Sequence, residues 1–169
     1  MLAPEVIARE EIRHLLIEYV QCADGGRTGR MLELFAEDAV MEPTGDPACH
    51  GRDEIRAYFE NAGRSIRRHM ATPALRHHLS SVHIELTSAA EARTTAYFLA
   101  VTEIGPDHWG RYRDTLRKDG DSWRITRRLL QLEGRTPGGW LDRHEAARGD
   151  GTHGDGTLGD GTRGDGAGA

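Results

Sequence analysis

The chain of 169 residues has 37% hydrophobic residues and a net charge of −5, which suits one globular domain with a modest core. Its mild acidity argues against nucleic acid as a general partner, and no apolar run is long enough for a membrane span. The N-terminus lacks a basic-then-apolar leader pattern, so we expect a soluble, cytoplasmic protein.

The first third of the chain predicts three helices and one short strand. Apolar residues recur at helical spacing over residues 4–23, and Asp24-Gly25-Gly26 would end that helix. We expect a short second helix over residues 28–35 and a third over residues 51–66. Between these two helices, residues 39–42 predict a short strand.

After Pro73 the pattern changes from helical spacing to alternation. It predicts four consecutive strands, over residues 74–86, 91–104, 108–118 and 122–133. Turns are expected at residues 105–107 and at Asp119-Gly120, a typical hairpin sequence. Helices followed by an antiparallel meander predict an α+β domain, with three helices packed on one face of a curved sheet.

A five-residue Gly/Asp repeat begins near residue 148, so we expect one domain over residues 1–147 and a disordered tail over residues 148–169. A calcium-binding β-roll is the alternative interpretation. The β-roll repeat has a different period and stacks an apolar residue in each turn, whereas the Gly/Asp tract of this chain offers only Leu158.

Histidines cluster between His69 and His83, which raises the question of a metal site. The sequence has no HExxH motif and no paired cysteines. His77 and His78 are adjacent, so on a strand they point to opposite faces and do not share one ion. We therefore expect no metal site, and we expect His69 and His83 to be solvated.

Six short phrases carry a resemblance to a known family. They are EI…Y…AD at 11–24, LFAEDAV at 34–40, GRDEI at 51–55, RH at 76–77, GRYRD at 110–114 and DGDSWRI at 119–125. Their order and intervals resemble the SnoaL-like branch of the nuclear transport factor 2-like superfamily, over nearly the whole chain before the tail. The resemblance implies a cone-shaped α+β barrel.

Within that superfamily the chain resembles scytalone dehydratase, bile-acid 7α-dehydratase and hexachlorocyclohexane dehydrochlorinase. Those lyases use an Asp at the end of the first helix and a His at the start of the first long strand, where this chain has Asp24 and His77. The resemblance also implies catalytic roles for Tyr19, in a Tyr-x-x-Cys-x-Asp phrase, and for Arg128, at the position of the dehydrochlorinase's site Arg. It implies no cofactor.

The chemistry of such a dyad is proton transfer. A neutral imidazole at His77 would remove a proton beside an activating group while Asp24 fixes its tautomer, and Tyr19 would polarise a carbonyl or leaving oxygen. Structural roles remain open: Asp24 could be a turn former, Tyr19 a core aromatic, and Arg128 a partner of Asp114.

Strand phase leaves open which histidine faces inward. Residues 82, 84 and 86 share a face with His78, unless a bulge near residues 79–80 reverses the phase. The resemblance favours His77. We expect His78, Phe98 and Tyr112 to contribute to substrate binding.

The chain also departs from the pattern of the resembling enzymes. The scytalone and bile-acid enzymes carry a further polar group on the second long strand, where this chain has Val101. Thr102, Glu103 or His108 could take that place.

The favoured function is a cofactor-free lyase, isomerase or cyclase acting on a small apolar metabolite such as a polyketide, terpenoid or steroid-like molecule. Three alternatives stand beside it: an epoxide hydrolase with Asp24 activating water, a cofactor-free oxygenase or oxygenase subunit, and a non-catalytic ligand-binding or association module. We expect a homodimer or homotrimer, because the open sheet face of such a domain tends to pair.

Overall fold

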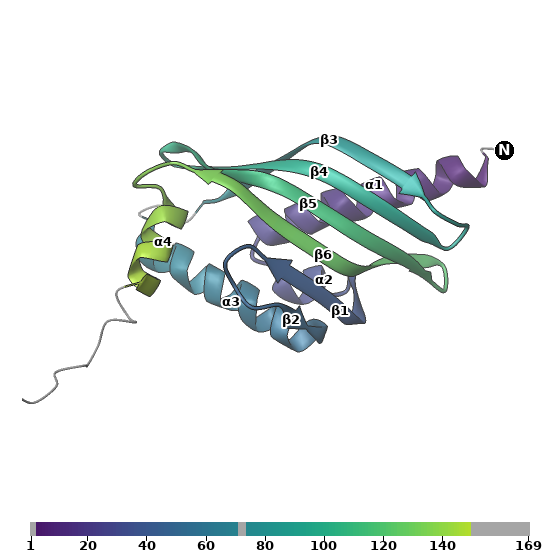
Figure 1. The fold of residues 1–169 in the computed structure, drawn as a ribbon, viewed down its shortest axis with the longest axis horizontal. Coiled ribbons are helices and arrows are strands. Elements are labelled where there is room, and N and C mark those ends of the chain that lie inside the picture. Colours follow the sequence, from purple (N-terminus) through teal and green to yellow (C-terminus); the bar gives the residue numbers. More distant parts are fainter. Residues whose placement is uncertain (1–2, 71–73, 150–169) are drawn as a thin grey trace, which may run out of the picture.

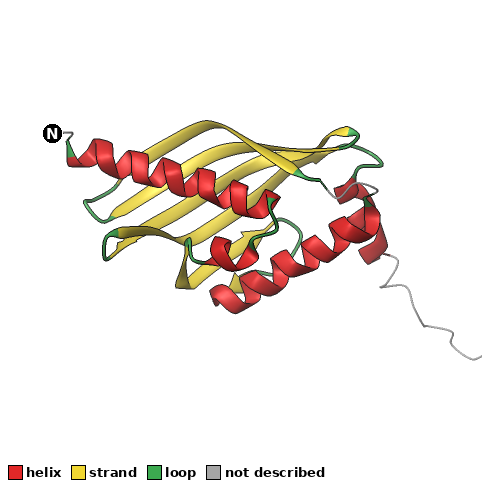
Figure 2. Cartoon of the chain, turned by 180° about the vertical axis from the view of Figure 1, so that it is seen from behind, coloured by secondary structure: helices red, strands yellow, loops and turns green. Residues whose placement is uncertain are grey.

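A computed structural model describes residues 3–70 and 74–149. Its elements in chain order are α1 (Pro4–Asp24), α2 (Thr28–Leu32), β1 (Phe35–Pro43), β2 (Cys49–His50), α3 (Gly51–His69), β3 (Arg76–Leu86), β4 (Glu91–Thr102), β5 (Gly105–Asp119), β6 (Ser122–Arg135) and α4 (Trp140–Gly149). The expected α+β class is confirmed: α1, α2 and α3 lie across one face of a single curved sheet (Figures 1 and 2).

The sheet has six strands in the order β2-β1-β6-β5-β4-β3. β1 runs parallel to β6, and every other neighbouring pair is antiparallel. The long strands β3 to β6 form the expected meander, because each turn between them is short. The parallel β1–β6 pair requires a long crossover, which is the whole chain from β2 through β5.

The core lies between the sheet and the covering helices. The apolar face of α1 is buried against it through Ile12, Leu15, Leu16, Tyr19 and Val20. Burying one such aliphatic side chain contributes about 1.5–3 kcal/mol, so this helical face holds α1 on the sheet. Gly25 and Gly26 end α1, and Gly26 adopts a positive φ of 64°. Asp24 is thereby fixed as the last helical residue.

The second helix is shorter than expected because its last predicted residue belongs to the sheet. α2 ends at Leu32, and Phe35 begins β1. Phe35 is fully buried and lies in register with Ile125 of β6, whose N–H donates to Leu34 O at 2.9 Å. The tertiary pairing with β6 thus prevails over the local helical pattern.

Two differences concern the ends of the later elements. The turn between β4 and β5 lies at residues 103–104, so residues 105–107, expected to be that turn, begin β5. The sequence pattern also did not predict the helix α4, which extends to Gly149 and therefore includes residues 148–149 of the expected tail. The rest of the Gly/Asp repeat lies outside the described residues.

Helix α4 also changes the surroundings of His69, which was expected to be solvated. His69 ends α3 and is only partly exposed, since its Nδ1 lies 3.2 Å from Ser65 Oγ and its carbonyl accepts from Arg143 of α4 at 3.0 Å. Ser65 Oγ also lies 2.6 Å from His144 Nδ1. Within residues 3–70 and 74–149, no helix is both long and apolar enough to cross a membrane.

Candidate active site

The end of α1 places the Asp24 carboxylate against the first residues of β3. Asp24 Oδ1 lies 2.7 Å from Nδ1 of His77, and the backbone N–H of His77 donates to Oδ1 and Oδ2 at 3.2 and 3.1 Å. A carboxylate only accepts, so Nδ1 carries the proton and Nε2 is the nitrogen available to a ligand. The two residues, 53 positions apart in sequence, form one unit with 16% and 12% side-chain exposure.

A bulge in β3 decides that His77 faces inward. The β3–β4 register shifts between Ser80 and His83, and Ser81 adopts a positive φ of 51°. His77 precedes the shift and faces the helices, while the partly buried Val82 takes the same face after it. The phase reversal therefore takes place.

The same bulge corrects the expectation for His78. Its side chain is exposed on the outer face of β3 and is not part of the cavity wall. The prediction that His78 contributes to substrate binding is therefore wrong for this cavity. His83 is exposed as expected.

Beside His77 lies a cavity of about 1130 Å³, bounded by the sheet, the α1–α2 corner, α3 and α4. Its wall includes Tyr19 of α1 and, from the sheet, His77, Phe98, His108, Tyr112 and Leu130. Phe98 and Tyr112 stack with ring centroids 4.7 Å apart, and Tyr19 meets Tyr112 edge-on at 5.7 Å. The structure therefore brings Tyr19, Phe98 and Tyr112 to the cavity together with His77.

Arg128 lies behind this aromatic wall and does not line the cavity. Its Nε and Nη2 contact the two carboxylate oxygens of Asp114 at 2.8 and 2.6 Å, and both side chains are fully buried. The guanidinium carbon lies 3.9 Å from the centroid of the Tyr19 ring and 4.5 Å from that of Tyr112. Arg128 is thus placed to position the tyrosines, and direct contact with a substrate is not supported.

The electrostatics of this layer keep both tyrosines as neutral hydroxyls. Burial raises the pKa of Tyr19, although nearby Arg128 opposes the rise, and burial raises the pKa of Tyr112 well above its ordinary value. Burial also opposes the charge of Arg128, but the Asp114 carboxylate outweighs it and raises the pKa of the guanidinium. Tyr19 and Tyr112 therefore keep their phenolic protons, and both residues line the cavity.

A second histidine, His108, lies in the cavity wall with its ring centroid 6.2 Å from that of His77. Its Nδ1 lies 2.8 Å from Oδ2 of Asp107. Of the three candidates for the missing polar group, only His108 reaches the cavity, since Thr102 and Glu103 do not line it. Sequence reasoning missed Asp107 because residues 105–107 were expected to form a turn.

A second bulge, between β4 and β5, explains why Asp107 and His108 are both buried. Ala100 of β4 pairs with His108 and Val101 pairs with Pro106, so Asp107 is the extra residue between them. Both Asp107 and His108 are therefore buried, although neighbours on a regular strand would face opposite sides.

In the described part of the chain, no three His, Cys, Asp or Glu side chains converge as ligands for an ion.

Comparison with known proteins gives a family match and many similar folds. The profile of the SnoaL-like domain matches residues 4–129. A protein from Novosphingobium aromaticivorans provisionally named a scytalone dehydratase is 24% identical, with 79% of this chain and 89% of that chain covered and a TM-score of 0.69. A protein of unknown function with a cystatin-like fold from Nostoc punctiforme is 20% identical, with 76% and 93% covered and a TM-score of 0.66.

The structure of a hexachlorocyclohexane dehydrochlorinase, LinA type 2, is 14% identical, with 79% of this chain and 90% of that chain covered and a TM-score of 0.66. At these identities the similarities establish the fold. The distant structural relatives thus include lyase-type enzymes beside proteins of unknown function.

Proposed function

Because the chain belongs to the SnoaL-like domain family, we propose that it is a cofactor-free lyase or isomerase that uses Asp24 and His77 for proton transfer. The observation that carries the proposal is the 2.7 Å contact between Asp24 Oδ1 and His77 Nδ1 at the edge of an aromatic cavity. The names of the dehydratase and dehydrochlorinase neighbours agree with this class of reaction.

In the proposed step, Nε2 of neutral His77 takes a proton from a carbon next to an electron-withdrawing group. Asp24 holds the imidazole through Nδ1 and stabilises the imidazolium that forms. The backbone N–H of His77 also donates to this carboxylate, which fixes its position relative to the ring. Tyr19 donates its O–H to the oxygen on which negative charge develops.

The cavity favours a small, mostly apolar substrate with at least one oxygen. Stacked Phe98 and Tyr112 offer flat apolar surface to a ring, and Leu130 extends the apolar wall. Beside this apolar wall the side chains of His77, His108 and Tyr19 also meet the cavity. The α1–α2 corner and α3 add charged side chains to its lining, among them Arg27, Arg56 and Glu60. A polyketide, terpenoid or steroid-like molecule would suit such a wall.

The test uses 5-nitro-1,2-benzisoxazole, a small aromatic probe whose ring opens to a coloured phenolate when a base removes its C–H proton. His77→Gln keeps a polar side chain of similar size but removes the base, so kcat/KM should fall by about 10²-fold or more. Asp24→Asn should also reduce turnover, because an amide can stabilise the wrong tautomer of His77.

The matched control is His83→Gln, which changes an exposed histidine on the outer face of the same strand. It should leave turnover and thermal stability unchanged. Turnover by the folded His77→Gln protein equal to that of the wild type would contradict the proposed function. It would then favour a non-catalytic binding module.

A further inference from the structure

The cavity wall contains a second carboxylate–imidazole pair that the proposed mechanism does not use. His108 Nδ1 lies 2.8 Å from Oδ2 of Asp107, whose side chain is fully buried, while that of His108 is 10% exposed. The carboxylate engages Nδ1, so Nε2 is the nitrogen of His108 available to a ligand, as it is in His77. The ring centroid of Phe98 lies 5.9 Å from that of His108 and 6.4 Å from that of His77.

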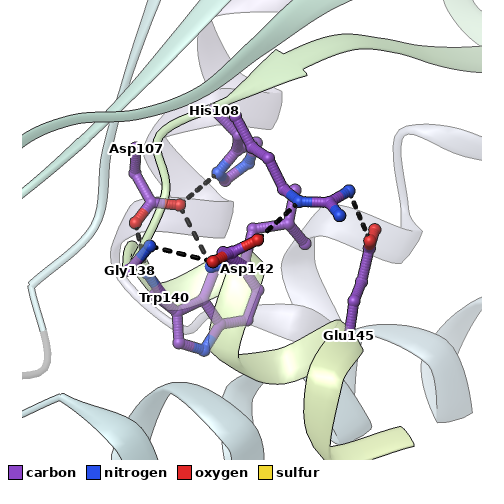
Figure 3. A network of polar contacts seen from close by, with 8 residues as sticks. Asp107, His108, Gly138, Trp140, Asp142 and Glu145 are labelled. Atoms are coloured by element: carbon purple, nitrogen blue, oxygen red, sulfur yellow. Dashed lines mark hydrogen bonds and ion pairs between the residues drawn. The ribbon is translucent and has the colours of Figure 1, made fainter. Parts of the chain in front are cut away.

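Helix α4 holds the carboxylate of this pair. The backbone N–H of Trp140 donates to Oδ1 of Asp107 at 2.5 Å, and that of Leu141 donates to Oδ2 at 3.2 Å (Figure 3). These N–H groups begin the helix and have no acceptor within it, so Asp107 supplies the cap. The ring centroids of Trp140 and His108 also lie 5.8 Å apart.

The first turn of α4 is itself tied to β6. Asp142 Oδ2 accepts from the Gly138 N–H at 2.8 Å, and its Oδ1 accepts from Arg135 Nε at 3.0 Å (Figure 3). Arg135 also pairs with Glu145 one turn further along the helix. These contacts hold the start of α4 over the carboxylate of Asp107.

Burial opposes the charge of Asp107, but hydrogen bonds from His108 and from the two N–H groups of α4 outweigh it and lower the pKa of this carboxyl. Asp107 therefore remains an acceptor, facing an imidazole that can carry a positive charge. Residues 140–141 lie outside the segment matched to the SnoaL-like domain, residues 4–129, so this support comes from the C-terminal part of the chain.

We propose that His108 is a second proton-transfer residue of this cavity, donating a proton to the leaving group while His77 removes the proton from carbon, and that Asp107 and α4 position it. The inference rests on the proposed lyase or isomerase function and deepens it. The substrate class becomes a compound whose acidic C–H and basic leaving oxygen can each reach one of two neighbouring imidazoles, the ring centroids of which lie 6.2 Å apart.

Every proton and electron pair in the elimination step is accounted for. Nε2 of neutral His77 takes the proton from carbon, the C–H electron pair forms the new π bond, and the bond to the leaving oxygen breaks towards oxygen. Protonated His108 gives its Nε2 proton to that oxygen. His77 ends protonated and His108 neutral, and proton exchange with water restores the starting pair without any oxidant, reductant or other reactant.

The experiment compares two probes that differ in the basicity of the oxygen they release. 1,2-Benzisoxazole opens to a more basic phenolate than 5-nitro-1,2-benzisoxazole, whose nitro group delocalises the charge, so only the first needs much help from a general acid. In the full-length protein, His108→Gln should lower kcat/KM for 1,2-benzisoxazole at least about 10-fold and for the nitro compound less than about 3-fold.

The positioning role of Asp107 has a separate readout. In protein with ¹⁵N-labelled histidine, the NMR spectrum of neutral His108 should report the Nδ1–H tautomer, and Asp107→Asn should shift it towards Nε2–H. An Nε2–H tautomer in the unaltered protein would overturn the assignment of Asp107.

The outcomes distinguish a failure of the role of His108 alone from a failure of the proposed function. Turnover that requires His77 but falls equally for both probes in His108→Gln, or does not fall for either, would overturn the second proton-transfer role alone. No turnover, or turnover that survives His77→Gln, would overturn the proposed function and this inference with it. His83→Gln again serves as the control that should change neither probe.

Discussion

Replacing Asp114 by Asn tests how the aromatic wall of the cavity is held. Asp114 and Arg128 are both fully buried and joined by two hydrogen bonds, at 2.8 and 2.6 Å. An amide cannot neutralise the guanidinium, and its NH₂ group would face donors of Arg128 where the second carboxylate oxygen now accepts. Leaving one member of a buried pair uncompensated costs about 3–5 kcal/mol.

A chain of this size loses about 2–4 °C of melting temperature for each kcal/mol, so Asp114→Asn should lower Tm by roughly 6–20 °C. Differential scanning calorimetry measures this shift directly. The matched control is Asp38→Asn, because Asp38 pairs with Arg117 at 3.5 Å on the surface and its side chain is 74% exposed. That change should cost about 0–1 kcal/mol.

The double variant Asp114→Leu, Arg128→Met removes both charges and fills the space with apolar groups, so it should recover most of the stability lost in Asp114→Asn. Equal shifts in Tm for Asp114→Asn and Asp38→Asn would refute the reasoning. A double variant less stable than Asp114→Asn would refute it as well.

Three further predictions concern backbone geometry and pH. Folding lowers the pKa of Asp107, so its carboxylate stabilises the folded chain above the unfolded value near 3.9, and this contribution is lost as the pH falls through the lower folded value. Urea titrations should therefore show a stability difference between Asp107→Asn and the unaltered protein that is larger at pH 7 than at pH 3; a constant difference would contradict this. Ser81→Val places a β-branched residue at a φ of 51° and should cost about 1–2 kcal/mol, whereas Ser81→Gly should cost nothing, as chemical unfolding of both would show. Gly110→Ala would make Cβ collide with the Gln131 carbonyl oxygen, so the β5–β6 pairing should loosen. Hydrogen exchange of unchanged rate at Gln131 and its neighbours would argue against that clash.

Local patterns were sufficient to predict the order and type of most elements. The 3.6-residue spacing of apolar side chains in α1 and the alternation after residue 73 each report the one face that the element buries, so both could be seen without a partner. The same patterns failed where the tertiary structure changed the local preference. Phe35 joined a parallel strand pair instead of extending a helix, because Ile125 lies beside it in the fold.

The candidate site depended much more on the tertiary structure. Spacing does not predict contact between residues 53 apart, and only the resemblance brought Asp24 and His77 together before the fold was known. Whether His77 or His78 faced the cavity depended on one bulge at Ser80–Ser81. A single extra residue in a strand reverses the face of every residue after it, so alternation alone cannot decide the question.

What the sequence determined by itself was therefore the set of amphipathic elements, their order and the class of fold they can form. The tertiary structure alone decided that a bulge turns both Asp107 and His108 inward, that Asp107 caps the start of α4, and that Arg128 lies behind two tyrosines instead of in the cavity. The physical reason is that amphipathic periodicity is a local property of the chain. Strand register and the meeting of polar groups depend on the packing of segments far apart in the sequence.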